Sequence, residues 1–372
     1  MKKHMKKNLS LLLGTMLIVL LFIGCGGNAN EENRSGNDAA LSVVFVVTGQ
    51  LGDMSFNDSA HAGVIRMSET MDVHTNVIEI GRDQTRWQPA FEDLAESGDY
   101  DIIITNGSNA GELIKSIAPN HPEQNFILFD TELEGDHPNI YAISYLQNEA
   151  SFLAGIVAAK VTTSDMPFAN EENKIGFIGG SEHPIITDFL VGFVEGALSV
   201  NPDITVYVSY IGSWDDTARG KETAVAMFNQ GVDIIFPAAE QAGLGVIEAA
   251  LELDKYIIGV DSDQAMLFAE SSPERANIIL TSVLKEVGNS LVRAVELEKA
   301  GELPWGTYES LGLFEDGVGL ADNEFFQANV LAEIREAVIA GREAVIAGDI
   351  VVTSALNDGE GRAQAIIDSV AP

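Results

Sequence analysis

The charged residues that could bind a ligand follow apolar segments of this chain. Asp130 directly follows the apolar segment 125–129, Asp261 directly follows 255–260, and Lys285 comes just after 278–283. A carboxylate can accept hydrogen bonds from two neighbouring hydroxyl groups, and hydrogen bonds to charged groups are roughly twice as strong as neutral ones. Because each acid directly ends an apolar segment, these residues are candidates for contacts to a polar ligand.

Two aromatic residues, Phe56 and Trp214, stand in polar segments of the same kind. Each ring could simply close the top of a hydrophobic core. Alternatively, the two rings could stack on both sides of a flat ligand, since base–aromatic stacking contributes about 1–3 kcal/mol per base. For single polar residues in these segments, capping of the following helix is the other open interpretation, and Asp58, Asp188 and Asp216 fit it well.

Ten short segments rich in Val and Ile are predicted to be strands, and their nearly continuous apolar character is typical of strands buried on both faces. Amphipathic stretches alternate with them, which favours parallel sheets covered by helices. Ten strands fit two doubly wound α/β lobes, with a break near 144–147. Ligands of such sheets bind beyond the carboxyl ends of the strands. The predicted strands are 42–48, 75–80, 101–105, 125–129, 139–144, 174–178, 204–210, 232–236, 255–260 and 278–283; the predicted helices are 58–70, 85–97, 109–118, 147–162, 187–199, 216–230, 243–253 and 285–300.

The first 24 residues are predicted to be a lipoprotein signal peptide. A basic segment, 1–7, precedes an apolar one, 9–23, which is shorter than a membrane span and fits the apolar region of a signal peptide. The tripeptide Phe-Ile-Gly before Cys25 resembles a bacterial lipobox. We therefore expect Cys25 to be the lipidated N-terminus and 25–40 to be a flexible tether at the outer side of the cell membrane; an uncleaved anchor is the alternative.

The net charge excludes some partners. The chain of 372 residues has a formal charge of −35, which becomes −39 without residues 1–24 and their four Lys. Such a surface repels nucleic acids and anionic headgroups. A hydrophobic content of 46% with only 21% charged residues is that of a folded globule rather than a disordered chain.

Motifs for enzymatic chemistry are missing from the sequence. It contains no P-loop, no HExxH and no G-x-S-x-G, and its six His are scattered. Asp261 and Asp263 lack the further oxygen ligands of an EF-hand loop. The sequence therefore predicts neither an enzyme nor a cofactor or metal site, although a nucleoside hydrolase with Asp clusters at strand ends stays open as an alternative.

Several of these segments together resemble the BMP (basic membrane protein) family of substrate-binding lipoproteins. The resemblance covers about 41–350 and implies the type I periplasmic-binding-protein fold, with two lobes joined by three crossing strands. One lobe would comprise 41–145 plus 283–303, and the other 146–282 plus 304–372. The motifs that carry the resemblance are GDMSFND at 52–58, Phe129-Asp130, IGFIGG at 175–180, GSWDD at 212–216, GVDSDQ at 259–264 and TSVLK at 281–285.

The resemblance also implies a ligand and roles for single residues. Members characterised as receptors bind purine nucleosides for the permease of an ABC importer. We expect this protein to act as a monomer. Phe56 and Trp214 would then sandwich the purine, and Asp261 would accept hydrogen bonds from the ribose hydroxyls. The other expected ligand-binding residues are Asp53, Ser55, Asn57 and Asp130 of the first lobe, Gly243, which would let backbone approach, and Lys285, which would donate to the sugar.

The sequence departs from the family pattern at two places. Trp214 stands where Phe is common, and Glu240-Gln241 stands where small residues are usual. The second departure adds bulk and a negative charge near the expected sugar or base. A sugar or autoinducer-like polyol therefore remains an alternative ligand on the same fold.

Overall fold

The computed structural model describes residues 40–358 and 360–372, and residues 40–372 form one compact unit. The predicted signal peptide, Cys25 and nearly all of the predicted tether lie outside the described residues. Within the described part of the chain, no helix is both long and apolar enough to cross a membrane.

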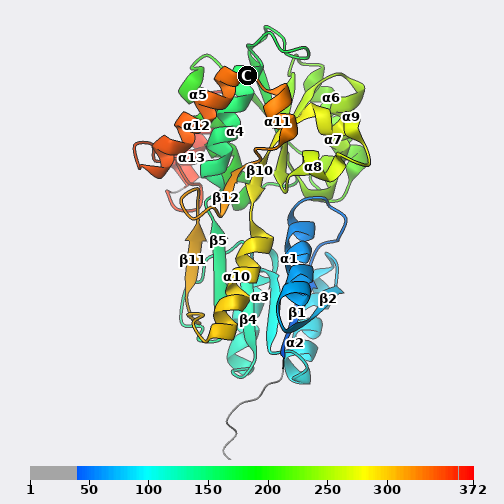
Figure 1. The fold of residues 1–372 in the computed structure, drawn as a ribbon, viewed down its shortest axis with the longest axis vertical. Coiled ribbons are helices and arrows are strands. Elements are labelled where there is room, and N and C mark those ends of the chain that lie inside the picture. The colour runs from blue at the N-terminus through cyan, green and yellow to red at the C-terminus, as the bar shows by residue number, and fades with distance from the viewer. Residues whose placement is uncertain (1–39, 359) are drawn as a thin grey trace, which may run out of the picture. The chain divides into compact units, whose positions relative to one another are not determined.

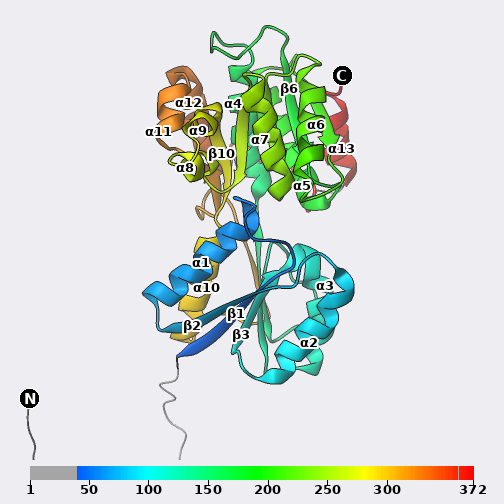
Figure 2. The ribbon, with the colours of Figure 1, turned by 90° about the vertical axis from the view of Figure 1, so that its right-hand side faces the viewer.

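The first lobe is built on a six-stranded parallel sheet with the order β11-β5-β4-β3-β1-β2. Helices cover both faces, with α1 and α10 on one side and α2 and α3 on the other (Figure 2). Alternate residues of the central strands face the two helical layers, and both sets are buried, as the apolar runs require. The strands are β1 (Leu41–Val47), β2 (Val73–Glu79), β3 (Ile102–Asn106), β4 (Asn125–Phe129), β5 (Ile140–Tyr145) and β11 (Tyr308–Leu311).

The second lobe repeats this arrangement, with the strand order β12-β10-β9-β8-β6-β7. Its sheet is likewise flanked by helices, α4 and α7 among them (Figure 1). All of its pairs are parallel except β12 with β10. One face packs against α4 and α5, and the other against α6, α7 and α8. The strands are β6 (Lys174–Gly179), β7 (Thr205–Tyr210), β8 (Ile234–Ala238), β9 (Tyr256–Asp261), β10 (Ile279–Lys285) and β12 (Val318–Leu320).

The prediction of two doubly wound lobes is confirmed, and each of the ten predicted strands overlaps one of β1 to β10. Strands β11 and β12 were missed because they have only four and three residues and no sustained apolar run. All eight predicted helices are present. The α-helices are α1 (Phe56–Thr70), α2 (Trp87–Ser97), α3 (Gly107–Ile117), α4 (Gln147–Val161), α5 (Pro184–Val200), α6 (Thr217–Phe228), α7 (Gly243–Glu252), α8 (Gln264–Phe268), α9 (Pro273–Ile278), α10 (Val287–Ala300), α11 (Glu324–Asn329), α12 (Ala332–Ile346) and α13 (Glu360–Asp368).

The chain crosses between the two lobes three times, from β5 to α4, from β10 to α10, and from β11 to β12. The second crossing follows Lys285, because β10 belongs to the second sheet over its full length. The third follows Leu311, because β11 pairs with β5 of the first sheet. The second stretch of chain in the first lobe therefore begins after Lys285 and ends at Leu311. It starts and ends later than the 283–303 expected from the resemblance.

Helices α4 and α5 of the second lobe pack closely against each other. A Cβ atom on Gly192 would overlap the backbone of Asn148, and one on Gly196 would overlap that of Phe152. Glycine therefore allows the two helix backbones to approach more closely than any larger residue would. This packing positions α5, whose N-terminal half contributes to the site described next.

Candidate functional site

A pocket lies where carboxyl ends of strands from both sheets meet, as the strand-end rule predicts. The pocket is partly open to solvent, and its cavity volume is about 50 Å³. Both lobes contribute to its walls. The lining residues are Phe56, Asn106, Ser108, Asn109, Asp130, His183, Ile185, Ile186, Phe189, Trp214, Ala238, Ala239, Glu240, Val260, Asp261 and Lys285.

Lys285 and Asp130 form a buried ion pair in this pocket. The Nζ atom of Lys285 donates to Oδ1 of Asp130 over 2.7 Å, and the two side chains are 2% and 5% exposed. The ammonium group also lies 5.4 Å from the ring centre of Phe56 and 4.9 Å from that of Phe189. Aromatic faces attract a cation at such distances, which offsets part of the cost of burying it.

Asp261 is buried at the end of β9 without an ion-pair partner in the described residues. Its Oδ2 accepts one hydrogen bond, from Ser55 Oγ of the first lobe at 3.2 Å. Burial raises the pKa of Asp261 to about 7, although the nearby charge of Lys285 opposes the shift. A carboxylate in this state gains from any ligand that offers it hydroxyl donors.

Three acidic residues that line the pocket have left-handed backbones. The φ angles of Asp130, Asp261 and Glu240 are +62°, +61° and +46°. Such angles are uncommon outside glycine, and strained residues of this kind cluster at functional sites. Asp130 follows β4, Asp261 ends β9, and Glu240 follows β8. At each of these strand ends the backbone turn places an acidic side chain at the pocket.

Phe56 and Trp214 both line the pocket, one from each lobe. Phe56 begins α1 and packs against Phe129 with ring centres 5.3 Å apart. Trp214 is partly exposed and lies over Gly180, where a Cβ atom would overlap the indole ring. The glycine after β6 thus makes room for the ring of Trp214.

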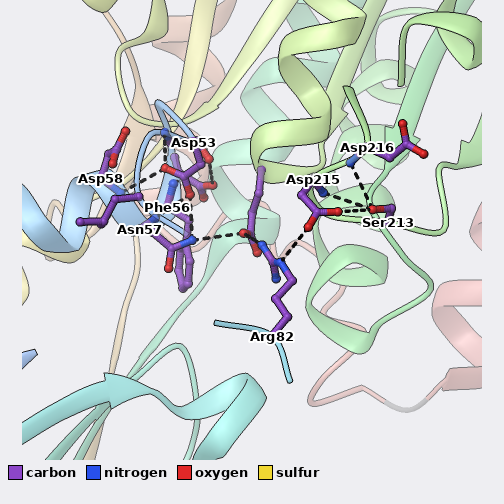
Figure 3. A network of polar contacts seen from close by, with 12 residues as sticks. Asp53, Phe56, Asn57, Asp58, Arg82, Ser213, Asp215 and Asp216 are labelled. Carbon is purple, nitrogen blue, oxygen red and sulfur yellow. Dashed lines mark hydrogen bonds and ion pairs between the residues drawn. The ribbon is translucent and has the colours of Figure 1, made fainter. Parts of the chain in front are cut away.

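Asp53, Ser55 and Asn57 do not line the pocket; they shape the loop that holds Phe56. The Asp53 carboxylate accepts hydrogen bonds from the backbone of Ser55, Asn57 and Asp58 (Figure 3). Burial raises the pKa of Asp53, and these backbone donors oppose the rise. In the structure, Asp53, Ser55 and Asn57 therefore position the loop and cap the start of α1. Helix capping was the alternative interpretation for polar residues that follow a strand.

Gly243, also expected at the ligand, begins α7 outside the pocket lining. A Cβ atom there would meet its nearest neighbours, Pro237 and Ala239, at ordinary contact distances of 3.8 and 3.9 Å. The described residues therefore give no close approach that demands glycine at this position.

An ion pair crosses between the lobes at Glu240. Arg82, which follows β2, donates from Nη2 to Glu240 Oε2 over 2.5 Å, and Asn57 Nδ2 donates to the same oxygen over 3.1 Å. Arg82 Nε also lies 4.0 Å from Oδ2 of Asp215 (Figure 3). Burial raises the pKa of Glu240 to about 6, and Arg82 opposes the shift.

The sequence reasoning missed several lining residues. Asn106, Ser108 and Asn109 stood among the polar residues after a predicted strand, so their position was a usable signal, but only the structure places them in the pocket. His183 caps α5, and its Nδ1 accepts from the backbone of Ile185. Burial lowers the pKa of His183, and the carboxylate of Asp130 opposes the fall.

Two parallel-sheet lobes joined by three crossings, with a pocket at their strand ends, are the type I periplasmic-binding-protein fold. A solved ABC transporter solute-binding protein from Aeropyrum pernix has this fold with a TM-score of 0.80 and 24% identity, over 89% of this chain and 97% of its own. The profile described as "ABC transporter substrate-binding protein PnrA-like" matches residues 40–354, so the chain belongs to the Bmp family.

Named relatives agree with this assignment. The chain is 31% identical to the ABC transporter nucleoside-binding protein BmpA of Lactococcus lactis, over 90% of this chain and 95% of the relative. It is 32% identical to basic membrane protein D of Borreliella burgdorferi, over 84% and 86%. The protein is thus an extracytoplasmic substrate-binding component of an ABC transporter, with a small-molecule ligand and permease partners. It is not an enzyme, which removes the nucleoside hydrolase alternative.

Proposed function

We propose that the pocket binds a purine nucleoside and that the protein delivers it to the permease from a lipid anchor on Cys25. The observation that carries the ligand proposal is the position of Phe56 and Trp214, which line one pocket from opposite lobes. A flat base between them would gain stacking on both faces, at about 1–3 kcal/mol per ring. The nucleoside-binding name of the Lactococcus lactis relative supports the same ligand class.

The charges of the pocket favour a neutral ligand with hydroxyl groups. Asp261 is buried and lacks a cation at hydrogen-bond distance, so the cis-diol of a ribose would satisfy it with two donors. Lys285 is already paired with Asp130, and Arg82 with Glu240. In the described part of the chain, the pocket therefore offers a phosphate no Lys or Arg without a carboxylate partner, and its three lining carboxylates would repel a phosphate. Nucleosides should therefore bind more tightly than nucleotides.

Lobe closure is the mechanism that this arrangement supports. A ligand between Phe56 and Trp214 contacts both lobes, so binding stabilises the closed arrangement of the crossing segments relative to an open one. The permease would recognise that closed arrangement. Closure is therefore expected to be the step that reports ligand occupancy to the transporter.

Calorimetry on residues 40–372 with adenosine, guanosine, inosine, ribose and AMP tests the ligand. We expect saturable binding of at least one nucleoside and much weaker binding of AMP and ribose. Saturable ribose binding without nucleoside binding would instead establish the sugar-receptor alternative.

The anchor requires a separate experiment on the full chain in a bacterial host. Lipidation predicts that the protein fractionates with membranes and that Cys25 carries acyl groups by mass spectrometry. The Cys25→Ser variant should lose this modification. An unmodified Cys25 in a chain that keeps residues 1–24 would contradict the anchor and support the uncleaved alternative.

A further inference from the structure

Glu240 is the lining acid that the family pattern does not predict. It follows β8, has a left-handed backbone with φ +46°, and contributes its side chain to the pocket wall. Only 11% of this side chain is exposed. A buried carboxylate in a strained backbone position is costly, so its place in a binding pocket calls for a compensating interaction.

Part of that compensation comes from the opposite lobe. Arg82 and Asn57, both of the first lobe, donate to the same oxygen of Glu240, Oε2, over 2.5 and 3.1 Å. Asp215 approaches the far side of the Arg82 guanidinium (Figure 3). Between them these contacts fix the direction of the carboxylate. The second oxygen, Oε1, accepts no hydrogen bond from any residue that the structure describes.

Glu240 and Trp214 line the same pocket, and their backbone segments lie close together. The backbone N–H of Ala242, two residues after Glu240, donates to the carbonyl oxygen of Trp214 over 2.9 Å. The residues expected at the sugar, Asp261 and Lys285, come from β9 and β10 instead. If the sugar lies at Asp261 and Lys285, a base that stacks on Trp214 is expected to turn an edge of its ring system toward Glu240.

We infer that Glu240 determines which purine bases bind. Its free carboxylate oxygen, Oε1, would select bases that carry an N–H donor on the edge that faces Glu240. This inference rests on the proposed nucleoside function. Adenosine carries an exocyclic amino group and guanosine carries both an amino group and a ring N–H, whereas purine riboside carries no N–H on its base. A hydrogen bond to a charged group is equivalent to about a 10- to 100-fold difference in affinity.

Calorimetry with adenosine, guanosine and purine riboside on the wild type, Glu240→Ala and Glu240→Gln tests this inference. For the wild type we expect adenosine or guanosine to bind about 10- to 100-fold more tightly than purine riboside. In Glu240→Ala this ratio should fall at least about tenfold. Glu240→Gln keeps the shape and one acceptor oxygen without the charge, so its ratio should lie between the other two. Circular dichroism establishes that each variant is folded.

Glu222→Gln is the matched control, since Glu222 is exposed on α6 of the same lobe and is not among the residues that line the pocket. This control should keep the wild-type ratio. A ratio in folded Glu240→Ala and Glu240→Gln equal to that of the wild type would overturn the role of Glu240 while leaving nucleoside binding intact. If the wild type binds none of the three compounds, the proposed function itself is overturned, and this inference with it.

Discussion

Lys285 at the end of β10 donates a hydrogen bond of 2.7 Å to Asp130 at the end of β4, and this buried ion pair links the two sheets. Neither side chain has the solvent needed to stabilise an isolated charge, with exposures of 2% and 5%. The pair lies immediately before the crossing from β10 to α10. We therefore expect loss of this ion pair to affect both the stability of the protein and the closure of its lobes.

Lys285→Met should destabilise the protein by about 3–5 kcal/mol at pH 7.5, because it leaves the Asp130 carboxylate buried without its partner. Urea denaturation measures this loss. The double variant Asp130→Asn, Lys285→Met removes both charges and should recover most of the stability. A single variant as stable as the wild type, or a double variant no more stable than the single one, would contradict this account of the pair.

Gly180→Ala should weaken ligand binding about tenfold or more without unfolding the protein. The added Cβ atom would overlap the indole of Trp214 and displace the ring from its place at the pocket, and stacking contributes about 1–3 kcal/mol. Trp214→Ala should cause a similar loss. Calorimetry gives the affinities and a thermal melt gives the stability.

Gly361→Ala serves as the control for that substitution. Gly361 lies in α13, is exposed, and has open space where the Cβ atom would go. The nucleoside affinity of Gly361→Ala should match that of the wild type. Wild-type affinity in both Gly180→Ala and Trp214→Ala would argue that Trp214 only covers the core.

Asp261→Asn should stabilise the ligand-free protein at pH 8. Burial raises the pKa of Asp261 from 3.8 to about 7, so the native state resists ionisation that the unfolded chain accepts. The resulting penalty is absent below about pH 4, grows between about pH 4 and 7, and is constant above that range. We expect a gain of at least about 1 kcal/mol at pH 8 and none at pH 4.

Denaturation of Asp261→Asn and of the control Asp93→Asn, an exposed change on α2, measures this gain. The control should leave the stability unchanged at both pH values. An Asp261→Asn variant that is less stable than the wild type at pH 8 would mean that the charged carboxylate is stabilising in the native state, contrary to the direction of its pKa shift.

Nucleoside affinity should fall as the pH drops below about 7, by up to about tenfold per pH unit. Hydroxyl groups of the ligand donate to the ionised form of Asp261, so binding must first remove its proton at low pH. Calorimetry between pH 5 and 8 measures the slope. The His183 imidazole also lines the pocket, so the comparison with Asp261→Asn is needed to assign the effect.

In Asp261→Asn the affinity should be low throughout and nearly independent of pH over this range. A wild-type affinity that does not change between pH 5 and 8 would show that the ligand does not require the ionised carboxylate. A slope that persists unchanged in Asp261→Asn would assign the titration to another group.

The sequence alone determined the two-lobed α/β fold and the strand-end position of the site. Continuous apolar runs such as those of β3 and β9 report burial on both faces, and burial is a local property that residue order records directly. Asp130, Asp261 and the two aromatic residues could be selected because they follow such runs. The same reasoning could not separate ligand contacts from loop capping, so Asp53 was placed at the ligand rather than in the loop beneath Phe56.

Which groups meet depends on the packing of the two lobes. Arg82 and Glu240 are 158 positions apart, and Lys285 and Asp130 are 155 apart. No periodicity relates such residues, because their contact depends on how two separately folded sheets bring their strand ends together. Strand β11 likewise exists because β5 offers it a partner, not because its four residues favour a strand. Local patterns thus specify what is buried, whereas the packing of the lobes decides which charges face one another.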